Sequence, residues 1–453
     1  MNAIEFTEMA RKKEIDIVEH TCQVIENIEK INKNYHYFNT ISKELAIEQA
    51  KKIAKSPKGT LCGLPVSVKD CICVKGVEST AGSKILKGYR PVFNATAVEN
   101  AIKEGAIIIG KTSQDEFGFG SFNVNVGVDF EMPRNPFDIE RCTGGSSGGS
   151  AGVTQMANFP HISIAESTGG SIACPASFCG VAGITPTYGL VSRYGLIDYA
   201  SSLDKIGAMA KTASECRLML GVIKGKDPKD ATSIDAKEGD SAVKKVAVIK
   251  EALEVDEKIK DMVLKALDSK GIKYDIVSLP LTAKYANSCY YILATSEAST
   301  NLAKFCGFKY GAEFSLEDSY NAHFTKARSA CFGKEAKRRI ILGTFARMAG
   351  FRDAFYLKAA KVRTMIINEY KQAFSQYDAL VSPTMPVLAP RLDELSKLTP
   401  LQSYMMDVLT VGPNLAGLPH MSINIGFSNR LPVGMMITAD HFCEGKLFEM
   451  AGH

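Results

Sequence analysis

Two clusters of glycine and serine, separated by about one helix and one strand, constrain this chain more than any other feature. The first covers residues 144–150 (GGSSGGS) and the second covers residues 167–172 (STGGSI). Glycine lets the backbone turn sharply and approach a ligand closely. Successive backbone N–H groups in such turns can stabilise an anion or a developing oxyanion. Serine hydroxyls held there are candidate nucleophiles, provided that a base lies nearby.

The base is not evident among the histidines. The chain has seven, and none lies in a recognisable Ser-His-Asp context, although chain order does not exclude a triad. Lys69 offers an alternative, because it follows the apolar run 64–68 and the pattern predicts a buried strand carrying one ammonium group. Burial disfavours charged lysine and lowers its pKa towards the range of a usable base. From the pattern alone, a lysine at a strand end with its head in water is the more common arrangement, because lysines are rarely buried.

The glycine clusters alone allow three interpretations: a structural turn, a nucleophile loop or a phosphate-binding loop. The spacing of a Walker motif with a terminal Gly-Lys-Ser/Thr is missing, and so is G-x-G-x-x-G. The residues around the clusters are therefore needed to choose among the three.

Residues 144–151, 167–172, 175–180, 186–189 and 202–207 together resemble the amidase signature family. The resemblance implies a nucleophile loop and a Ser-cisSer-Lys triad, with Ser171 as the nucleophile and Lys69 as the base. A fixed spacing separates the two serines in that family. The matching separation here, 171 − 147 = 24, selects Ser147 over Ser146 as the bridging serine.

The same resemblance implies two further features of the site. One is a cis peptide bond just before Ser147. The other is an oxyanion hole made by the backbone N–H groups of Thr168, Gly169, Gly170 and Ser171.

The C-terminal half carries a narrower resemblance. Residues 290–299, 332–340, 407–410 and 413–419 are similar to the A subunits of tRNA-dependent amidotransferases, which are glutaminases that feed ammonia to a partner. Matched by position, Arg339 would hold the carboxylate of glutamine and Asp407 its α-amino group, with Tyr290 beside them. Without the resemblance, the three would be taken for a solvated basic face, a surface acid and a core tyrosine.

This resemblance implies a function within a complex. The chain would hydrolyse glutamine and supply ammonia to the B subunit, where Glu-tRNA(Gln) or Asp-tRNA(Asn) is amidated, while the C subunit holds the pair together. ATP, Mg²⁺ and the misacylated tRNA would be used by the complex, and this chain would need no cofactor and no metal. Two alternatives stay open: a free-standing amidase acting on other small amides, and a scaffold subunit with weakened or lost catalysis.

Two positions depart from the family pattern. An aspartate usually stands four residues before the nucleophile and an arginine two residues after it, where this chain has Ser167 and Ala173. The two family residues can pair across the nucleophile loop, and a lone buried charge would be costly. Loss of both therefore resembles removal of one salt bridge as a unit, with an effect on loop rigidity and rate.

Composition is that of an ordinary globular enzyme. The chain has 453 residues, 45% hydrophobic and 23% charged, and its net charge of +5 is too balanced to argue for direct nucleic-acid binding. The twelve scattered cysteines favour small buried side chains in a reducing compartment. Because no signal peptide and no apolar stretch of membrane-spanning length is visible, we expect a cytoplasmic protein without a membrane segment.

Hydrophobic periodicity predicts an α/β fold. Two or three helices are expected within residues 4–55, after which strands alternate with helices. Strands are expected at 64–68, 106–111, 161–166, 244–249 and 275–279, and helices at 96–104, 147–157 and 257–269. Such alternation predicts an α/β sandwich, and the resemblance implies a large mixed sheet covered by helices on both faces. We expect a single domain with N-terminal helices (about 1–58), a catalytic core (about 59–225) and a substrate-pocket half (about 240–453).

Overall fold

A computed structural model describes residues 1–237, 239–315 and 319–452 of the chain. Its centre is one mixed sheet with the strand order β1-β3-β2-β4-β6-β5-β10-β11-β9-β7-β8. In that order the strands are Phe38–Ile41, Ile107–Thr112, Pro65–Lys69, Ile162–Ser167, Lys205–Ala210, Ala182–Thr185, His420–Ser428, Leu431–Ala439, Ala379–Pro383, Val246–Ile249 and Tyr274–Val277. The expected fold class, an α/β protein with a large mixed sheet, is confirmed.

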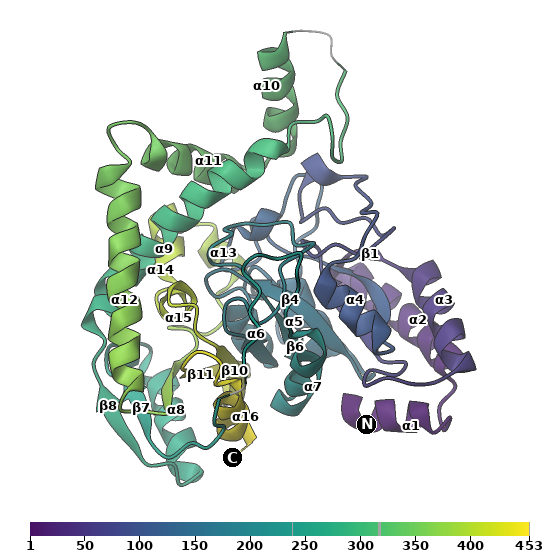
Figure 1. The fold of residues 1–453 in the computed structure, drawn as a ribbon, viewed down its shortest axis with the longest axis horizontal. Coiled ribbons are helices and arrows are strands. Elements are labelled where there is room, and N and C mark those ends of the chain that lie inside the picture. The colour runs from purple at the N-terminus through teal and green to yellow at the C-terminus, as the bar shows by residue number, and fades with distance from the viewer. Residues whose placement is uncertain (238, 316–318, 453) are drawn as a thin grey trace.

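Helices surround this sheet (Figure 1). In chain order α1 to α16 are Ala3–Arg11, Ile17–Tyr35, Lys43–Lys55, Thr96–Lys103, Gly148–Met156, Ala173–Cys179, Ala213–Ile223, Glu257–Ser269, Pro280–Asn301, Tyr320–Cys331, Lys334–Arg347, Lys358–Phe374, Leu392–Leu395, Pro400–Met405, Val411–Leu415 and Glu444–Gly452. The helices expected within 4–55 and at 257–269 are therefore present.

The central strands are covered on both faces. Ala165 and Met209, on neighbouring strands β4 and β6, pack into a cluster with residues of α5 and α6. Their chain neighbours Ile164 and Ala208 point the opposite way, as side chains in a strand alternate, and α7 packs on that side. Both helix layers are needed because these strands are buried throughout.

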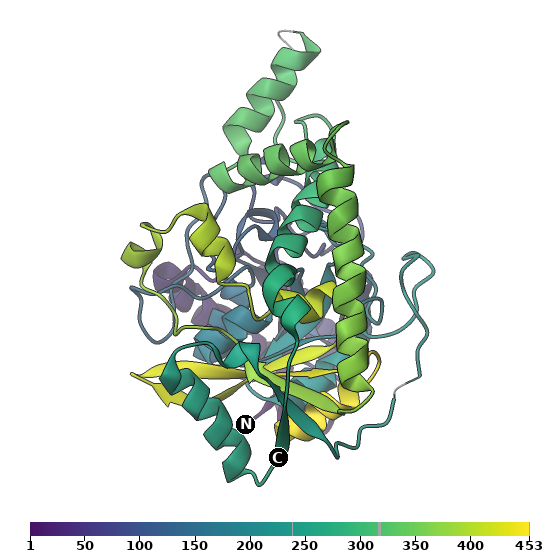
Figure 2. The ribbon, with the colours of Figure 1, turned by 90° about the vertical axis from the view of Figure 1, so that its left-hand side faces the viewer.

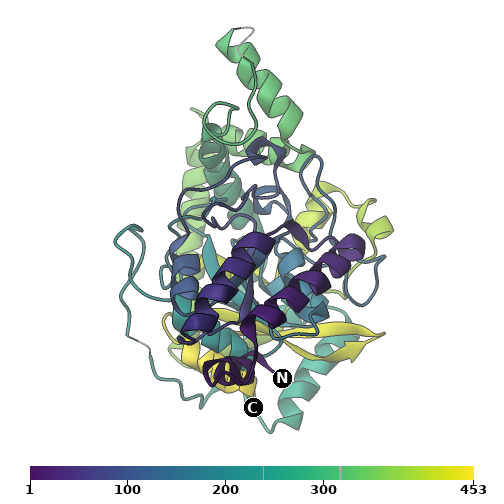
Figure 3. The same cartoon turned by 90° about the vertical axis from the view of Figure 1, so that its right-hand side faces the viewer.

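The two ends of the sheet carry different parts of the chain. Helices α2 and α3 lie over the end that contains β1, and Figure 3 shows them in front. Helices α11 and α12 both pack on α9 beside the other half of the sheet, and α10 projects beyond them (Figures 1 and 2). Helix α7 contacts both α1 and α16, which brings the two chain ends to one side of the molecule. Strands from both halves of the chain share this one sheet.

Candidate active site

The predicted catalytic residues meet at one edge of the sheet. Strands β2 and β4 are parallel neighbours, so their carboxyl ends lie side by side. Lys69 is the last residue of β2, and the second glycine-serine cluster begins at the last residue of β4. Strand β6 runs antiparallel to β4, which brings Asp204, just before β6, to the same edge. Parallel strand ends commonly form ligand sites in this way.

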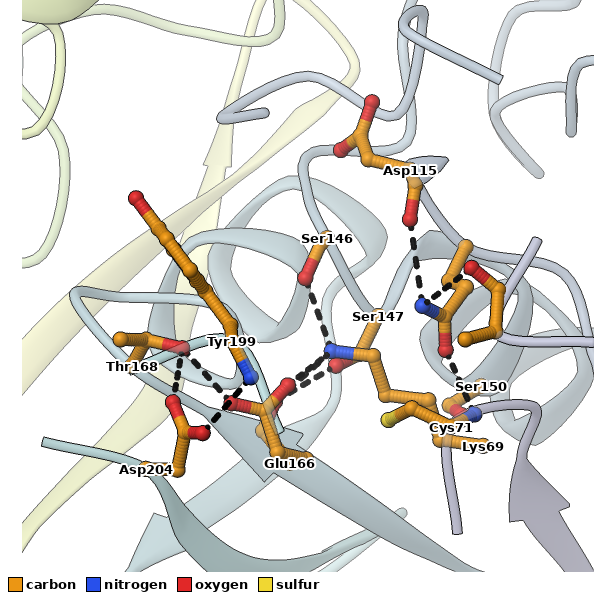
Figure 4. A network of polar contacts seen from close by, with 12 residues as sticks. Lys69, Cys71, Asp115, Ser146, Ser147, Ser150, Glu166, Thr168, Tyr199 and Asp204 are labelled. Carbon is orange, nitrogen blue, oxygen red and sulfur yellow. Dashed lines mark hydrogen bonds and ion pairs between the residues drawn. The ribbon is translucent and has the colours of Figure 1, made fainter. Parts of the chain in front are cut away.

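Lys69 is fully buried and makes three polar contacts, drawn in Figure 4. Its Nζ donates to Ser146 Oγ at 2.8 Å, to the backbone carbonyl of Glu166 at 3.0 Å and to the Glu166 carboxylate at 2.7 Å. The exposed fraction of the Lys69 side chain is 0%. Of the two environments that the sequence leaves open for Lys69, the structure therefore has the buried one.

The structure corrects the choice of the bridging serine. Ser146, not Ser147, lies against Lys69, while the Ser147 hydroxyl donates to the backbone carbonyl of Glu166 at 3.0 Å. The cis peptide bond joins Gly145 to Ser146, one position earlier than the resemblance implied. Ser147 directly precedes α5 but makes no side-chain capping bond, because its hydroxyl is occupied by the Glu166 carbonyl at the end of β4. The family spacing counted from Ser171 therefore selects Ser147, one position after the serine that contacts Lys69.

Ser171 lies in the tight loop between β4 and α6. Glycine is required before it, because a Cβ on Gly169 would come within 2.3 Å of the Tyr290 ring and one on Gly170 within 2.3 Å of Thr410 Oγ1. In the described part of the chain, the N–H groups of Gly169, Gly170 and Ser171 have no hydrogen-bond acceptor. Such unpaired amides beside a serine hydroxyl suit the stabilisation of an oxyanion. Thr168, the first residue of the predicted oxyanion hole, turns its side chain back towards Glu166.

One small pocket joins this loop to the predicted substrate residues. Its lining includes Gly118, Gly120, Gly145, Gly169, Gly170, Ser171, Tyr290, Tyr291, Arg339 and Asp407. Residues far apart in the sequence are thus placed around one space beside the candidate nucleophile. Arg339 and Asp407 are both largely buried, so the solvated surface positions expected without the resemblance do not occur.

Arg339 is held by one carboxylate and several aromatic rings. Its Nε donates to Glu335 at 2.8 Å and its guanidinium donates to the Tyr199 hydroxyl at 2.6 Å. The rings of Phe119, Tyr199, Tyr291 and Tyr404 lie 5.2–5.7 Å from the guanidinium carbon. Cation–π contacts stabilise a buried guanidinium. Among the described residues, Glu335 and Tyr199 accept from two of its five N–H groups, which leaves the others to bind an anion.

Asp407 lies on the other side of the same pocket. The Tyr291 hydroxyl donates to its carboxylate at 2.5 Å. Burial raises the pKa of Asp407 above its ordinary value, and the hydrogen bond from Tyr291 opposes that rise. A carboxylate in this position can bind an ammonium group, because the approaching charge offsets the cost of burial.

The sequence prediction misses several residues of the site. Glu166 directly precedes the second cluster as an acid in a buried strand, and this isolated acid was the available signal. Glu335 precedes Arg339 by four residues on α11, a helical pairing that could also have been recognised. Tyr199 and Tyr404 carry no local pattern, since only the fold brings them to Arg339.

The two departures from the family pattern lie beneath the nucleophile loop. Ser167 and Ala173 are both fully buried, at the end of β4 and the start of α6. Ser167 Oγ has no hydrogen-bond partner among the described residues. The nearby buried carboxylate is instead on Glu166, one residue earlier, where it pairs with Lys69.

Comparison with known proteins identifies the family of this chain. The Amidase family profile matches residues 19–448. The chain belongs to the amidase family. Among curated members of this family, it is 41% identical to the A subunit of glutamyl-tRNA(Gln) amidotransferase from Halothermothrix orenii, over 99% of this chain and 95% of that protein. It is 45% identical to the subunit of the same name from Archaeoglobus fulgidus, over 94% and 92%.

Solved amidase-family structures share the fold. The A subunit of glutamyl-tRNA(Gln) amidotransferase from Thermotoga maritima superposes with a TM-score of 0.80 at 34% identity, covering 100% of this chain and 93% of that one. A bacterial aryl acylamidase superposes with a TM-score of 0.83 at 21% identity, covering 99% and 94%. The second likeness concerns the fold alone.

The described part of the amidase-family chain offers no metal centre and no membrane segment. Within the described ranges, no three or more His, Cys, Asp or Glu side chains are grouped as a metal site would require. Across the same ranges, every helix is too short or too polar to span a bilayer.

Proposed function

We propose that this chain is the glutaminase subunit of a tRNA-dependent amidotransferase. The observation that carries the proposal is that Ser171 shares one pocket with Arg339 and Asp407. An amino acid substrate needs a cation for its carboxylate and an anion for its α-amino group, and this pocket offers both. A general amidase acting on neutral amides has no use for such a pair.

Glutamine binds with its charged end between Arg339 and Asp407 and its side-chain amide at Ser171. The remaining N–H groups of Arg339 hold the α-carboxylate, because guanidinium and carboxylate match in geometry. Tyr290 covers Gly169 and closes the wall beside the amide. These contacts fix the amide at the nucleophile and so lower the entropic cost of attack.

The chemistry uses Lys69 as the base and Ser146 as the bridge. Ser171 Oγ attacks the amide carbon, its proton passes to Ser146, and the Ser146 proton passes to the Lys69 amine. The backbone N–H groups of Gly169, Gly170 and Ser171 stabilise the oxyanion. The C–N bond then breaks as Lys69 returns the proton through Ser146 to the leaving nitrogen, which departs as ammonia. A water molecule hydrolyses the glutamyl ester by the same proton path and restores Ser171.

The ammonia is used by partner subunits. The curated relatives are named as A subunits of glutamyl-tRNA(Gln) amidotransferase, which supports Glu-tRNA(Gln) as the acceptor more than Asp-tRNA(Asn). The B subunit uses ATP and Mg²⁺ to amidate the misacylated tRNA, the C subunit holds the pair together, and the assembly works in the cytoplasm. This chain supplies no residue to the ATP-dependent step.

The test is an assay of the complex purified from the native host. Ammonia release from glutamine is measured with and without ATP and misacylated tRNA, and formation of amidated tRNA is followed in parallel. The proposal predicts glutamine-dependent amidation of the tRNA. Hydrolysis of simple amides in preference to glutamine would instead identify a general amidase.

Arg339→Ala is expected to raise the KM for glutamine by about 10- to 100-fold, the equivalent of losing a charge-assisted contact of roughly 1.5–3 kcal/mol. The rate at saturating glutamine should fall less, because Arg339 binds a group remote from the reacting amide. Steady-state kinetics of the complex checks the expectation.

Arg338→Ala is the matched control. Arg338 also pairs with Glu335, but its side chain is 40% exposed and it is not part of the pocket lining. Its removal should leave KM within a few-fold of the wild type. An unchanged KM in Arg339→Ala would favour the free-standing amidase.

A further inference from the structure

Glu166 accepts hydrogen bonds from Lys69 Nζ with two different oxygen atoms. Its backbone carbonyl accepts from Nζ at 3.0 Å and its carboxylate accepts at 2.7 Å, leaving Ser146 Oγ at 2.8 Å as the third contact (Figure 4). An amine nitrogen has three directions available beyond its bond to carbon. Two of them point at Glu166, so the third is aimed at Ser146.

We propose that Glu166 is a positioning residue for Lys69, which aims the amine at Ser146 and supplies the counter-charge of this buried base. The inference rests on the proposed function, since it concerns the proton path of that reaction. When Lys69 is neutral, its two N–H groups donate to Glu166 and its lone pair faces the Ser146 hydroxyl. When Lys69 is protonated, all three N–H groups are satisfied and it accepts no proton.

Lys69 and Glu166 form a buried ion pair. Both side chains of the pair are almost completely buried, so water screens their attraction little. An opposite charge within hydrogen-bonding distance favours the ionised form of a base. Replacing Glu166 by a neutral residue should therefore extend glutamine hydrolysis to lower pH.

Asp204 extends this cluster through Thr168. Thr168 Oγ1 lies 2.8 Å from Glu166 Oε1 and 2.8 Å from Asp204 Oδ1. A hydroxyl has one proton, so it donates to one carboxyl group and must accept from the other. Burial, and then the negative charge of Glu166, raise the pKa of Asp204 well above its ordinary value. Of the two carboxyl groups that share the Thr168 hydroxyl, Asp204 is therefore the one whose protonated form its surroundings favour.

The other ionisable groups near Lys69 leave Glu166 as its direct partner. Burial raises the pKa of Cys71 well above its ordinary value, which keeps this thiol neutral. Lys111, on β3, pairs with Asp70 at 3.6 Å, so these two charges compensate each other.

Two further ionisable groups lie near Lys69. Burial raises the pKa of Asp115 to about 6, but its carboxylate accepts from the N–H groups of Asn123 and Asn125 and does not contact Lys69. Burial also raises the pKa of the Tyr199 phenol, so it is neutral at working pH.

Glu166→Gln tests the charge. The glutamine amide keeps an acceptor for Lys69 Nζ but removes the counter-charge. In the pH profile of kcat/KM for glutamine, the fall in activity on the acid side (the acid limb) should therefore move to lower pH by about one to three units. At a pH below the wild-type limb, hydrolysis then rises about tenfold or more. The limiting rate at high pH should be equal or lower, because a less basic amine accepts a proton less readily.

Glu166→Ala tests the aim. This variant should show the same shift of the acid limb. Its limiting rate should be about tenfold below that of Glu166→Gln, because the amine loses one of the two acceptors that orient it. Because it also reports the limb, it keeps the test decisive if Glu166→Gln does not fold. Glu215→Gln is the matched control, since Glu215 is equally buried at the start of α7 and accepts from the N–H of Ala3 at 2.8 Å.

All variants are assayed as the complex, with thermal unfolding as the fold control. An acid limb that coincides with the wild type in both Glu166 variants overturns the inference, and so does an equal shift in Glu215→Gln. Asp204→Asn should leave the limb in place, because asparagine imitates a protonated carboxyl group. A shift there of a unit or more would contradict the proton assigned to Asp204.

The Ser171→Ala complex separates this inference from the proposed function. If wild type hydrolyses glutamine and Ser171→Ala does not, an unmoved limb counts against Glu166 alone. If the wild-type complex releases no ammonia from glutamine, the proposed function fails and the role of Glu166 falls with it.

Discussion

Ser171→Ala is expected to lower glutamine hydrolysis by roughly 10⁴-fold or more, because removing a nucleophile disables all residues that act with it. The change deletes one oxygen atom from a side chain that is 6% exposed and lines the pocket. Glutamine binding and the assembly of the complex should be retained. Ammonia release and equilibrium binding of labelled glutamine check the two halves of the expectation.

Ser177→Ala is a matched control for this loss. Ser177 lies on α6, only six positions after Ser171, and faces Gly434 on β11 instead of the pocket. It should keep most of the activity. Ammonia release near the wild-type rate from a well-folded Ser171→Ala complex would remove Ser171 from the role of nucleophile.

Most of the elements that build the active site could be predicted from local sequence patterns. The apolar run before Lys69 and the run before the second cluster indicate two buried strands, which are β2 and β4. The glycine clusters mark the turns that follow such strands. What periodicity does not contain is that β2 and β4 are parallel neighbours, and this pairing is what brings Lys69 to the cluster.

The strands near the C-terminus show a different limit. The hairpin of β10 and β11 is absent from the predicted strands. It turns at Asn429 and Arg430, which both have positive φ, at 51° and 65°. Two such residues form the turn that suits a tight hairpin, but the usual signal is a glycine at the second position. Arginine there conceals the turn.

The substrate pocket could be proposed only through the family resemblance. Arg339 belongs to a run of basic residues, and its burial depends on four aromatic rings from separate parts of the chain. Tertiary packing decides that environment, and no local pattern reports it. The bridging serine was missed for a simpler reason, since a count along the chain cannot show which of two adjacent hydroxyls faces Lys69.

Ser146→Ala should lower glutamine hydrolysis by about 10²- to 10⁴-fold, the range of a group that transfers a proton in the transition state. Ser146 is the hydroxyl that Lys69 contacts, at 2.8 Å, so its loss breaks the proton path to the base. Ser147→Ala should cost less than about tenfold, because the Ser147 hydroxyl donates to a backbone carbonyl and such a bond contributes about 1 kcal/mol. The comparison is made on glutamine hydrolysis by the two complexes.

The two variants control each other, since both remove a fully buried hydroxyl from adjacent positions. The thermal unfolding temperature should fall by similar amounts in both variants, while only Ser146→Ala should lose the rate of glutamine hydrolysis. The opposite ranking would restore Ser147 as the bridge and require the hydroxyls to exchange places during catalysis. Equal, small losses would mean that Ser171 passes its proton to Lys69 without a serine between them. The relative activity of these two variants therefore decides through which serine the proton passes when the amide bond is broken.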